Sequence, residues 1–260
     1  MIELLWMPFL ACVVLVLIHV YFGSFVIKRG ILFIDLALAQ WAALGFLVSE
    51  WLGIEHLLLT FLFGFGFTVI ASLLLSLLKP LYDRVNLQEA VIGVVYIVAT
   101  ALATGLISST GMEGHHIKEM LAGHLLFLQP KEVILAYGLY TAIAVLLIGL
   151  HRHFQQATSR KWNFIFYLLF GCVVTSSVKM VGVLLVFTYL VLPILSTMLF
   201  TDNPQSQLKW GWFLGILGSA LGLIMSMIVD IPPSYSVILS LSLIWVVLVT
   251  QKFIRLAQNK

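Results

Sequence analysis

Long apolar stretches, separated by short polar ones, run along almost the whole chain. A helix that crosses a bilayer needs about 20 mostly apolar residues. Lipid offers no partner for backbone N–H and C=O groups, so each crossing is expected to be helical. The pattern therefore predicts an all-α, polytopic membrane protein of about nine transmembrane helices, at 4–25, 31–50, 56–78, 88–109, 132–151, 163–180, 181–200, 211–229 and 235–251.

The boundary between 163–180 and 181–200, around Lys179 and Gly182, is nearly continuous in hydropathy. It is interpreted either as a turn between two spans or as a broken or re-entrant helix. The span 211–229 carries two successive GxxxG patterns, from Gly211 to Gly222, and such patterns permit close helix packing.

Composition supports one membrane domain over 1–260. Hydrophobic residues make up 62% of the chain and charged residues 10%, and no polar block is long enough for a separate soluble domain. The first span lacks a basic segment before it and a small-residue cleavage site after it, so it is expected to be a retained helix. Cys12 and Cys172 lie inside apolar stretches without CxxC spacing, which argues against a disulfide or thiolate metal site.

The basic residues predict the orientation. If the C-terminus is cytoplasmic and the spans alternate, 11 of the 14 Lys and Arg residues fall on the cytoplasmic side, as the positive-inside rule requires. Only Lys118, Lys131 and Lys179 fall outside. An odd number of spans then places the N-terminus outside. The net charge of +3 reflects this topology and gives no reason to expect nucleic-acid binding.

The longest predicted outer loop covers 108–131 and reads SSTGMEGHHIKEMLAGHLLFLQPK, with 117–127 apolar enough for a short interfacial helix. Imidazole and carboxylate groups suit zinc, manganese or iron. The loop is interpreted either as a metal-attracting mouth or as an ordinary solvated loop. The candidates are His115, His116 and His124 as metal ligands, with Glu113 and Glu119 at the mouth and Glu50, Glu55 and His56 joining them from the turn between the second and third spans.

Ionisable residues within spans are expensive and are candidates for function. Asp35 and Gln40 lie in the second span on neighbouring faces and are such candidates, although Asp35 could instead pair with Lys28 or Arg29. Other polar positions have structural explanations: His19 as a packing histidine, Glu89 at a helix N-terminus and Asp230 as a helix stop before two prolines.

Several catalytic patterns are missing from the sequence. It contains no GxxxxGK[ST] phosphate loop and no HExxH zinc-protease motif, and no Ser, His and Asp set is suitably placed for a hydrolase. The chain therefore has no nucleotide-binding loop of its own, and these patterns give no indication of an enzyme.

Five segments in order carry a resemblance to a known family: 23–45 (GSFVIKRGILFIDLALAQWAALG), 86–103, 120–134, 178–200 and 230–239. The most specific is the Val-Gly-x-Leu-Leu-Val sequence at 181–186 followed by Pro193. Together they resemble the ABC-3 family, the permease subunits of ABC importers for zinc, manganese and iron.

The resemblance implies a type II fold, like the vitamin B12 importers, in a bacterial cytoplasmic (inner) membrane. It also implies a dimer of cytoplasmic ATP-binding subunits, an extracytoplasmic solute-binding protein and a second permease copy, identical or paralogous. No permanently bound cofactor is expected, only the transported divalent metal. The inner loop 151–162 would be the coupling segment that meets the ATP-binding subunit, through His153, Phe154, Gln155, Gln156, Ala157 and Thr158.

One position departs from the family pattern. Many members place Asp and His, four residues apart, in the second helix as metal contacts, whereas this chain has Leu36 and Gln40 there, with Asp35 shifted by one. The resemblance therefore makes Asp35 and Gln40 the candidate metal contacts in this span. A neutral amide is a poorer transition-metal ligand than imidazole. The leading hypothesis is import of a divalent metal, with zinc first and manganese or iron next. The alternatives are a same-fold permease for a metal chelate or non-metal substrate, and a scaffold without transport.

Overall fold

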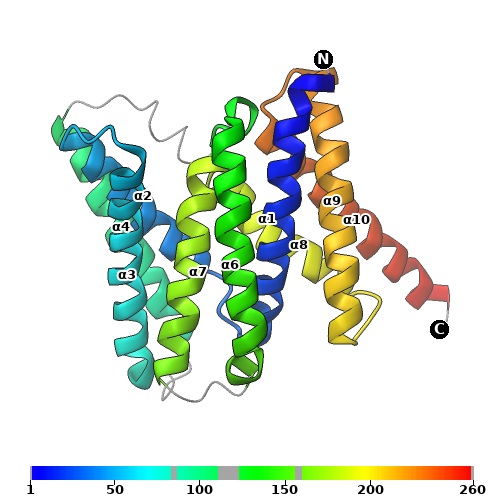
Figure 1. Ribbon diagram of the computed structural model, residues 1–260. Coiled ribbons are helices and arrows are strands. Elements are labelled where there is room, and N and C mark those ends of the chain that lie inside the picture. The colour runs from blue at the N-terminus through cyan, green and yellow to red at the C-terminus, as the bar shows by residue number, and fades with distance from the viewer. Residues whose placement is uncertain (1, 83–86, 111–122, 156–159, 259–260) are drawn as a thin grey trace.

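The computed structural model describes residues 2–82, 87–110, 123–155 and 160–258. All regular structure in these residues is helical, so the all-α prediction is confirmed (Figure 1). The helices are α1 (Ile2–Arg29), α2 (Ile34–Trp51), α3 (Leu57–Tyr82), α4 (Gln88–Thr110), the 3-10 turn η1 (Leu125–Phe127), α6 (Pro130–Gln155), α7 (Arg160–Val181), α8 (Val183–Thr197), α9 (Pro204–Val229) and α10 (Pro233–Gln258).

The nine α-helices of the described residues follow the nine predicted spans in order. Seven of them are long and apolar enough to cross a membrane. The other two are α8, which has 15 residues, and α2, whose 18 residues include Asp35, Gln40 and Glu50. Because α2 and α8 fall short by length or polarity, nine complete crossings stay a prediction.

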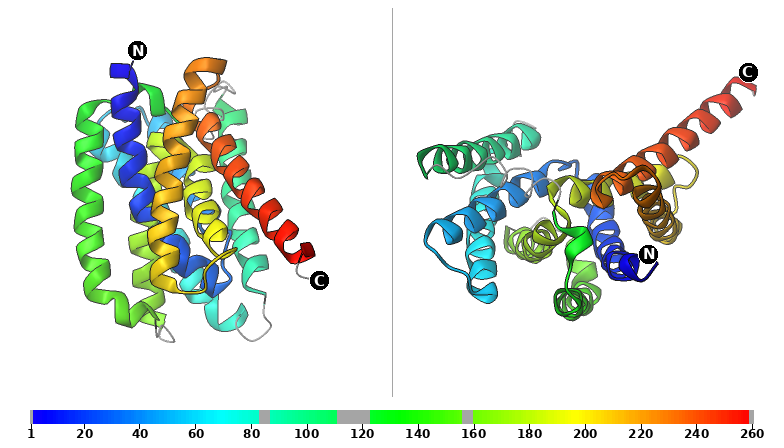
Figure 2. Two further views of the ribbon diagram at one scale, coloured as in Figure 1. Left: turned by 90° about the vertical axis from the view of Figure 1, so that its right-hand side faces the viewer. Right: turned by 90° about the horizontal axis from the view of Figure 1, so that it is seen from above.

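The interior of the bundle is formed by α1, α2, α7 and α8, because most residues of α2 and α8 and most of the apolar windows of α1 and α7 are buried. The two chain ends lie at opposite ends of the bundle (Figure 1). Seen from above, α4 and α10 lie at the periphery, and α10 leans away from the other helices (Figure 2). Along α3, α4, α6 and α10 only 17–28% of each apolar window is buried, as expected for helices that face lipid or another subunit.

The uncertain boundary near Lys179 is a one-residue break between two helices. Gly182 separates α7 from α8 and has φ 82°, a left-handed value that favours glycine. Its N–H donates to the Val178 carbonyl oxygen at 2.9 Å and its own carbonyl accepts from Val186 N at 3.3 Å. The chain therefore changes direction at Gly182 without leaving those backbone groups unpaired.

The glycines of α9 provide the close packing that their spacing predicted. A Cβ at Gly215 would lie 2.6 Å from a Val16 methyl group of α1, and a Cβ at Gly222 would lie 2.4 Å from the Val237 Cα of α10. The glycine face therefore brings α9 against both α1 and α10, and a larger residue at Gly222 would meet backbone rather than a mobile side chain.

His19 is a packing residue, as its sequence context indicated. The ring is fully buried and its Nδ1 donates to the Leu15 carbonyl oxygen at 2.8 Å. Its Nε2 lies 3.1 Å from the Ser177 Oγ of α7. Both ring nitrogens thus have partners, and the hydrogen bond to Ser177 joins the two central helices.

Candidate functional site

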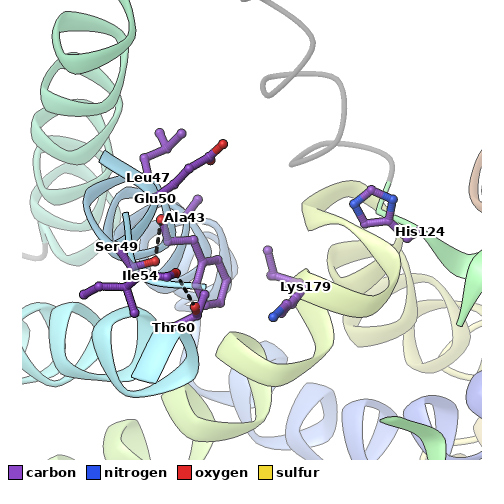
Figure 3. Close-up of a pocket in the computed structure, with 10 residues that line it drawn as sticks. Ala43, Leu47, Ser49, Glu50, Ile54, Thr60, His124 and Lys179 are labelled. Atoms are coloured by element: carbon purple, nitrogen blue, oxygen red, sulfur yellow. Dashed lines mark hydrogen bonds between the residues drawn. The ribbon is translucent and has the colours of Figure 1, made fainter. Parts of the chain in front are cut away.

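A cavity of about 290 Å³ opens between the C-terminal ends of α2 and α7 (Figure 3). One wall belongs to α2 and the facing wall to Val178 and Lys179 of α7. The α2–α3 connection, α3 and the start of η1 complete it. The lining residues are Ala43, Phe46, Leu47, Ser49, Glu50, Ile54, Thr60, His124, Val178 and Lys179.

The α2 wall continues a single face of that helix. Gln40, Ala43, Leu47 and Glu50 follow one another at spacings of three or four residues, which places them along one side. Gln40 is buried, one turn further from the cavity than Ala43. A substrate that enters between α2 and α7 would therefore meet the Gln40 side of α2 next.

Asp35 does not share this face. Five residues at 3.6 per turn separate it from Gln40 by about 140° around the helix, so the two are further apart than neighbouring faces would place them. The carboxyl is almost fully buried in the first turn of α2. A negative charge on Asp35 would be repelled there by the carboxylate of Glu89 of α4. Asp35 and Gln40 are thus not brought together as a pair of metal ligands.

The charges of the cavity are mixed. Glu50 is exposed at the end of α2, while Lys179 is half-buried and interacts electrostatically with Glu132. His124 lies across the opening, where its backbone N–H donates to the Met180 carbonyl oxygen at 3.1 Å. Carboxylate and imidazole can bind transition metals, whereas the ammonium group repels them. No three His, Cys, Asp or Glu side chains converge as a metal site within the part of the chain that the structure describes.

The other predicted outer residues are distributed differently. Glu55 and His56 are exposed in the α2–α3 connection and do not line this cavity. Asp230 ends α9 with φ 57° and lines a second cavity, of about 450 Å³, that also contains His124. Glu113, His115, His116 and Glu119 lie outside the described residues, as does the part 117–122 of the helix predicted at 117–127. Within the described part, 123–127, the only helical turn is the 3-10 turn Leu125–Phe127.

Lys179 is the functional candidate that the sequence interpretation missed. It was noted only as an outer basic residue near an uncertain boundary. It is nevertheless the one charged residue between 163 and 200, and an ionisable group in such a stretch is itself a functional signal.

At the other end of the bundle, Glu89 does more than begin α4. Its Oε1 accepts a hydrogen bond from the backbone N–H of Leu32 at 2.6 Å, which ties α4 to the turn before α2. Arg29 does not pair with Asp35. Its Nη2 donates to the Phe154 carbonyl oxygen at 2.7 Å, while Asp35 Oδ1 has no hydrogen-bond partner in the part of the chain that the structure describes. Lys28 is exposed, so the ion pair considered for Asp35 is not present among these described residues.

The predicted coupling segment is divided between two helices. His153, Phe154 and Gln155 belong to the last turn of α6, and α7 begins at Arg160. Phe154 is only 1% exposed, so its side chain belongs to the interior. Gln156, Ala157 and Thr158 lie outside the described residues.

The profile of the ABC 3 transport family matches residues 1–252, nearly the whole chain. The chain belongs to this family. It is 23% identical over 231 residues to the manganese transport system membrane protein MntC of Halalkalibacterium halodurans, covering 84% of this chain and 76% of the relative. It is 22% identical over 261 residues to the high-affinity zinc uptake system membrane protein ZnuB of Haemophilus influenzae, covering 95% and 97%.

Solved structures show the same ABC permease fold. PsaBC from Streptococcus pneumoniae in complex with Fab superposes with a TM-score of 0.77 at 18% identity, covering 95% of this chain and 91% of that one. An inward-facing putative metal-chelate type ABC transporter gives a TM-score of 0.65 at 19% identity, covering 94% and 85%. As a member of the ABC 3 family, the chain is the membrane component of a transporter.

Proposed function

We propose that this protein is the membrane-spanning permease subunit of an ABC importer that carries a divalent transition metal into the cytoplasm. The observation that carries the proposal is the family match over 1–252, together with relatives named for manganese and zinc that align over most of both chains. The outer cavity is the proposed entrance for the metal, because its α2 wall lies on the same face of the helix as Gln40.

The proposed cargo is Zn²⁺ or Mn²⁺. The amide oxygen of Gln40 and the carboxylate of Glu50 are hard donors of the kind that manganese accepts, whereas the imidazole of His124 also suits zinc. None of these groups forms a closed cage, which is compatible with a path that must release what it takes up. Both metals therefore belong in the uptake assay.

The proposed assembly follows from the missing phosphate loop and from the family. A dimer of ATP-binding subunits would bind from the cytoplasm, an extracytoplasmic solute-binding protein would deliver the metal, and a second permease, identical or paralogous, would complete the path. We infer nine crossings in a type II arrangement in a bacterial cytoplasmic membrane, with the N-terminus outside and the C-terminus inside. ATPase closure would then tilt the helices for alternating access.

A second candidate cargo is a metal chelate with negative charge. The observation that favours it is Lys179, whose ammonium group lines the outer cavity where a bare dication would be repelled. The replacement of imidazole by an amide at Gln40 points the same way, since a chelated metal needs no ligand from the protein.

Reconstitution tests these candidates. The permease would be placed in liposomes with its ATP-binding subunit and binding protein, and ATP-driven uptake of zinc, manganese and their anionic chelates would be measured. The metal hypothesis expects uptake of one or both free ions. Uptake of chelates alone would support the second candidate. A complex whose ATPase activity no substrate stimulates would leave the chain as a scaffold.

A further inference from the structure

Arg29, at the last residue of α1, joins three helices at the inner end of the bundle. Its Nη2 donates to the Phe154 carbonyl oxygen of α6 at 2.7 Å, and its guanidinium carbon lies 4.3 Å from the centre of the Phe166 ring of α7. A hydrogen bond from an ionised donor is roughly twice as strong as a neutral one. The cation over the ring adds a second, independent attraction.

The groups that Arg29 contacts are themselves tightly packed. The Phe154 ring lies 5.6 Å from Phe166 and 6.2 Å from Trp162, centre to centre, and Phe154 is almost fully buried. Nearby, the Tyr21 hydroxyl of α1 lies 2.7 Å from His151 Nδ1 of α6. The end of α6 and the start of α7, which belong to the predicted coupling segment, are therefore attached to the end of α1.

Arg29 is also followed directly by the turn that leads into α2. Gly30 has φ 64°, and α2 begins at Ile34. From the far side of this turn, Glu89 of α4 holds the Leu32 N–H at 2.6 Å. The turn is thus held between the α6 end, through Arg29, and α4, through Glu89.

A cavity at this end of the bundle leaves space beside the Arg29 side chain. Arg29 and Glu89 line one cavity of about 430 Å³. Arg29 Nη1 and Glu89 Oε2 are both buried and have no hydrogen-bond partner among the described residues. Arg29 and Glu89 thus share a cavity in which each carries one polar atom without a described partner.

We propose that Arg29 is a positioning residue that transmits movement of the end of α6 and the start of α7, the described parts of the segment 151–162, through the α1–α2 turn to α2, and so to the outer cavity. The physical reason is continuity: the α6 carbonyl moves Arg29, Arg29 moves the turn, and α2 carries the Gln40 to Glu50 face that forms one wall of the cavity. This inference rests on the proposed function, since the drive comes from an ATP-binding subunit at that segment.

The test is the ratio of metal transported to ATP hydrolysed in the reconstituted complex. Arg29→Ala should lower this ratio about tenfold while the complex still assembles and hydrolyses ATP. Arg29→Lys keeps the charge but cannot hold the carbonyl and the ring at once, so its ratio should fall by a smaller factor. Lys28→Ala, an exposed basic residue one position away, is the matched control and should keep the wild-type ratio.

A second measurement reports how accessible the wall of the outer cavity is. Ile54→Cys places a thiol in the cavity wall, and its labelling by a membrane-impermeant maleimide should change when ATP is added. The change should disappear when Arg29→Ala is combined with it. The chain without Ile54→Cys reports any background from Cys172, which is only partly buried.

The outcomes separate this inference from the function beneath it. If the wild-type complex transports neither metal nor chelate, the proposed function fails. If the wild type transports and Arg29→Ala keeps both the ratio and the ATP-dependent labelling, the positioning role of Arg29 is overturned. Should Arg29→Ala not assemble, Arg29→Lys decides, and a wild-type ratio together with unchanged labelling in that variant would overturn the inference.

Discussion

The backbone N–H of His124 donates to the carbonyl oxygen of Met180 at 3.1 Å, which fixes the end of the outer loop on the last turn of α7. Beside this bond, Gly123 has φ 63° and packs against the α7–α8 break. The loop and the break are therefore one unit, and it lies next to Lys179, which helps to form the outer cavity. This close packing leaves no room for a larger side chain at Gly123.

Gly123→Ala is expected to destabilise the protein. A Cβ there would lie 2.2 Å from the Val181 carbonyl carbon, and the left-handed φ adds strain, so a loss of about 1–3 kcal/mol is expected. The measurement is thermal unfolding of the purified permease in detergent. Gly138→Ala is the control, because it lies in α6 with nothing within 4 Å of an added Cβ. Equal unfolding temperatures for the two variants would contradict the packing of the loop against the break.

The charges of the outer cavity should determine the form in which the cargo enters. For a free dication, Glu50→Gln should raise the KM for uptake and Lys179→Met should lower it, each by about fivefold, as expected for one charge near the protein surface. For an anionic chelate both effects reverse. Uptake at low substrate concentration in proteoliposomes measures this.

The matched controls for these charge changes lie away from the cavity. Asp202→Asn and Lys209→Met remove exposed charges near the start of α9 and should leave the KM unchanged. If Glu50→Gln and Lys179→Met also leave it unchanged, the cavity is not the entrance.

Gln40→His should shift the metal preference toward zinc. Imidazole is a better zinc ligand than an amide oxygen, so zinc should compete more strongly against manganese in the variant, by about tenfold. The measurement is manganese uptake in the presence of increasing zinc. Gln205→His, an exposed position on α9, is the control. An unchanged competition curve for Gln40→His would place the metal path away from this face of α2.

His19→Gln should affect stability and leave transport intact. The buried ring bonds to Leu15 and Ser177, and imperfect replacement of those bonds is expected to lower stability by about 1–3 kcal/mol. The KM for metal uptake should stay within experimental error of the wild type. A large change in KM without a change in unfolding temperature would show that His19 belongs to the transport path.

Much of the candidate site depends on contacts that no local pattern contains. Glu50 was predicted for the outer mouth and His124 as a metal ligand, but Lys179, which faces them from α7, lies far along the sequence from either. Similarly, Glu89 was explained by the helix that it begins, whereas its carboxylate reaches Leu32, 57 residues away. The sequence suggested Lys28 or Arg29 as an ion-pair partner of Asp35, yet Arg29 donates to the carbonyl oxygen of Phe154, 125 residues away.

The sequence by itself determined the helices, their order and their membrane character, because apolar length and glycine spacing are local properties that burial in lipid acts on directly. It also indicated the family, through segments that stand in order along the chain. Only the tertiary structure decided which side chains share a cavity and which carbonyl Arg29 holds. Those choices follow from how α1, α2, α4, α6 and α7 pack, and packing depends on the shapes of several distant helices at once.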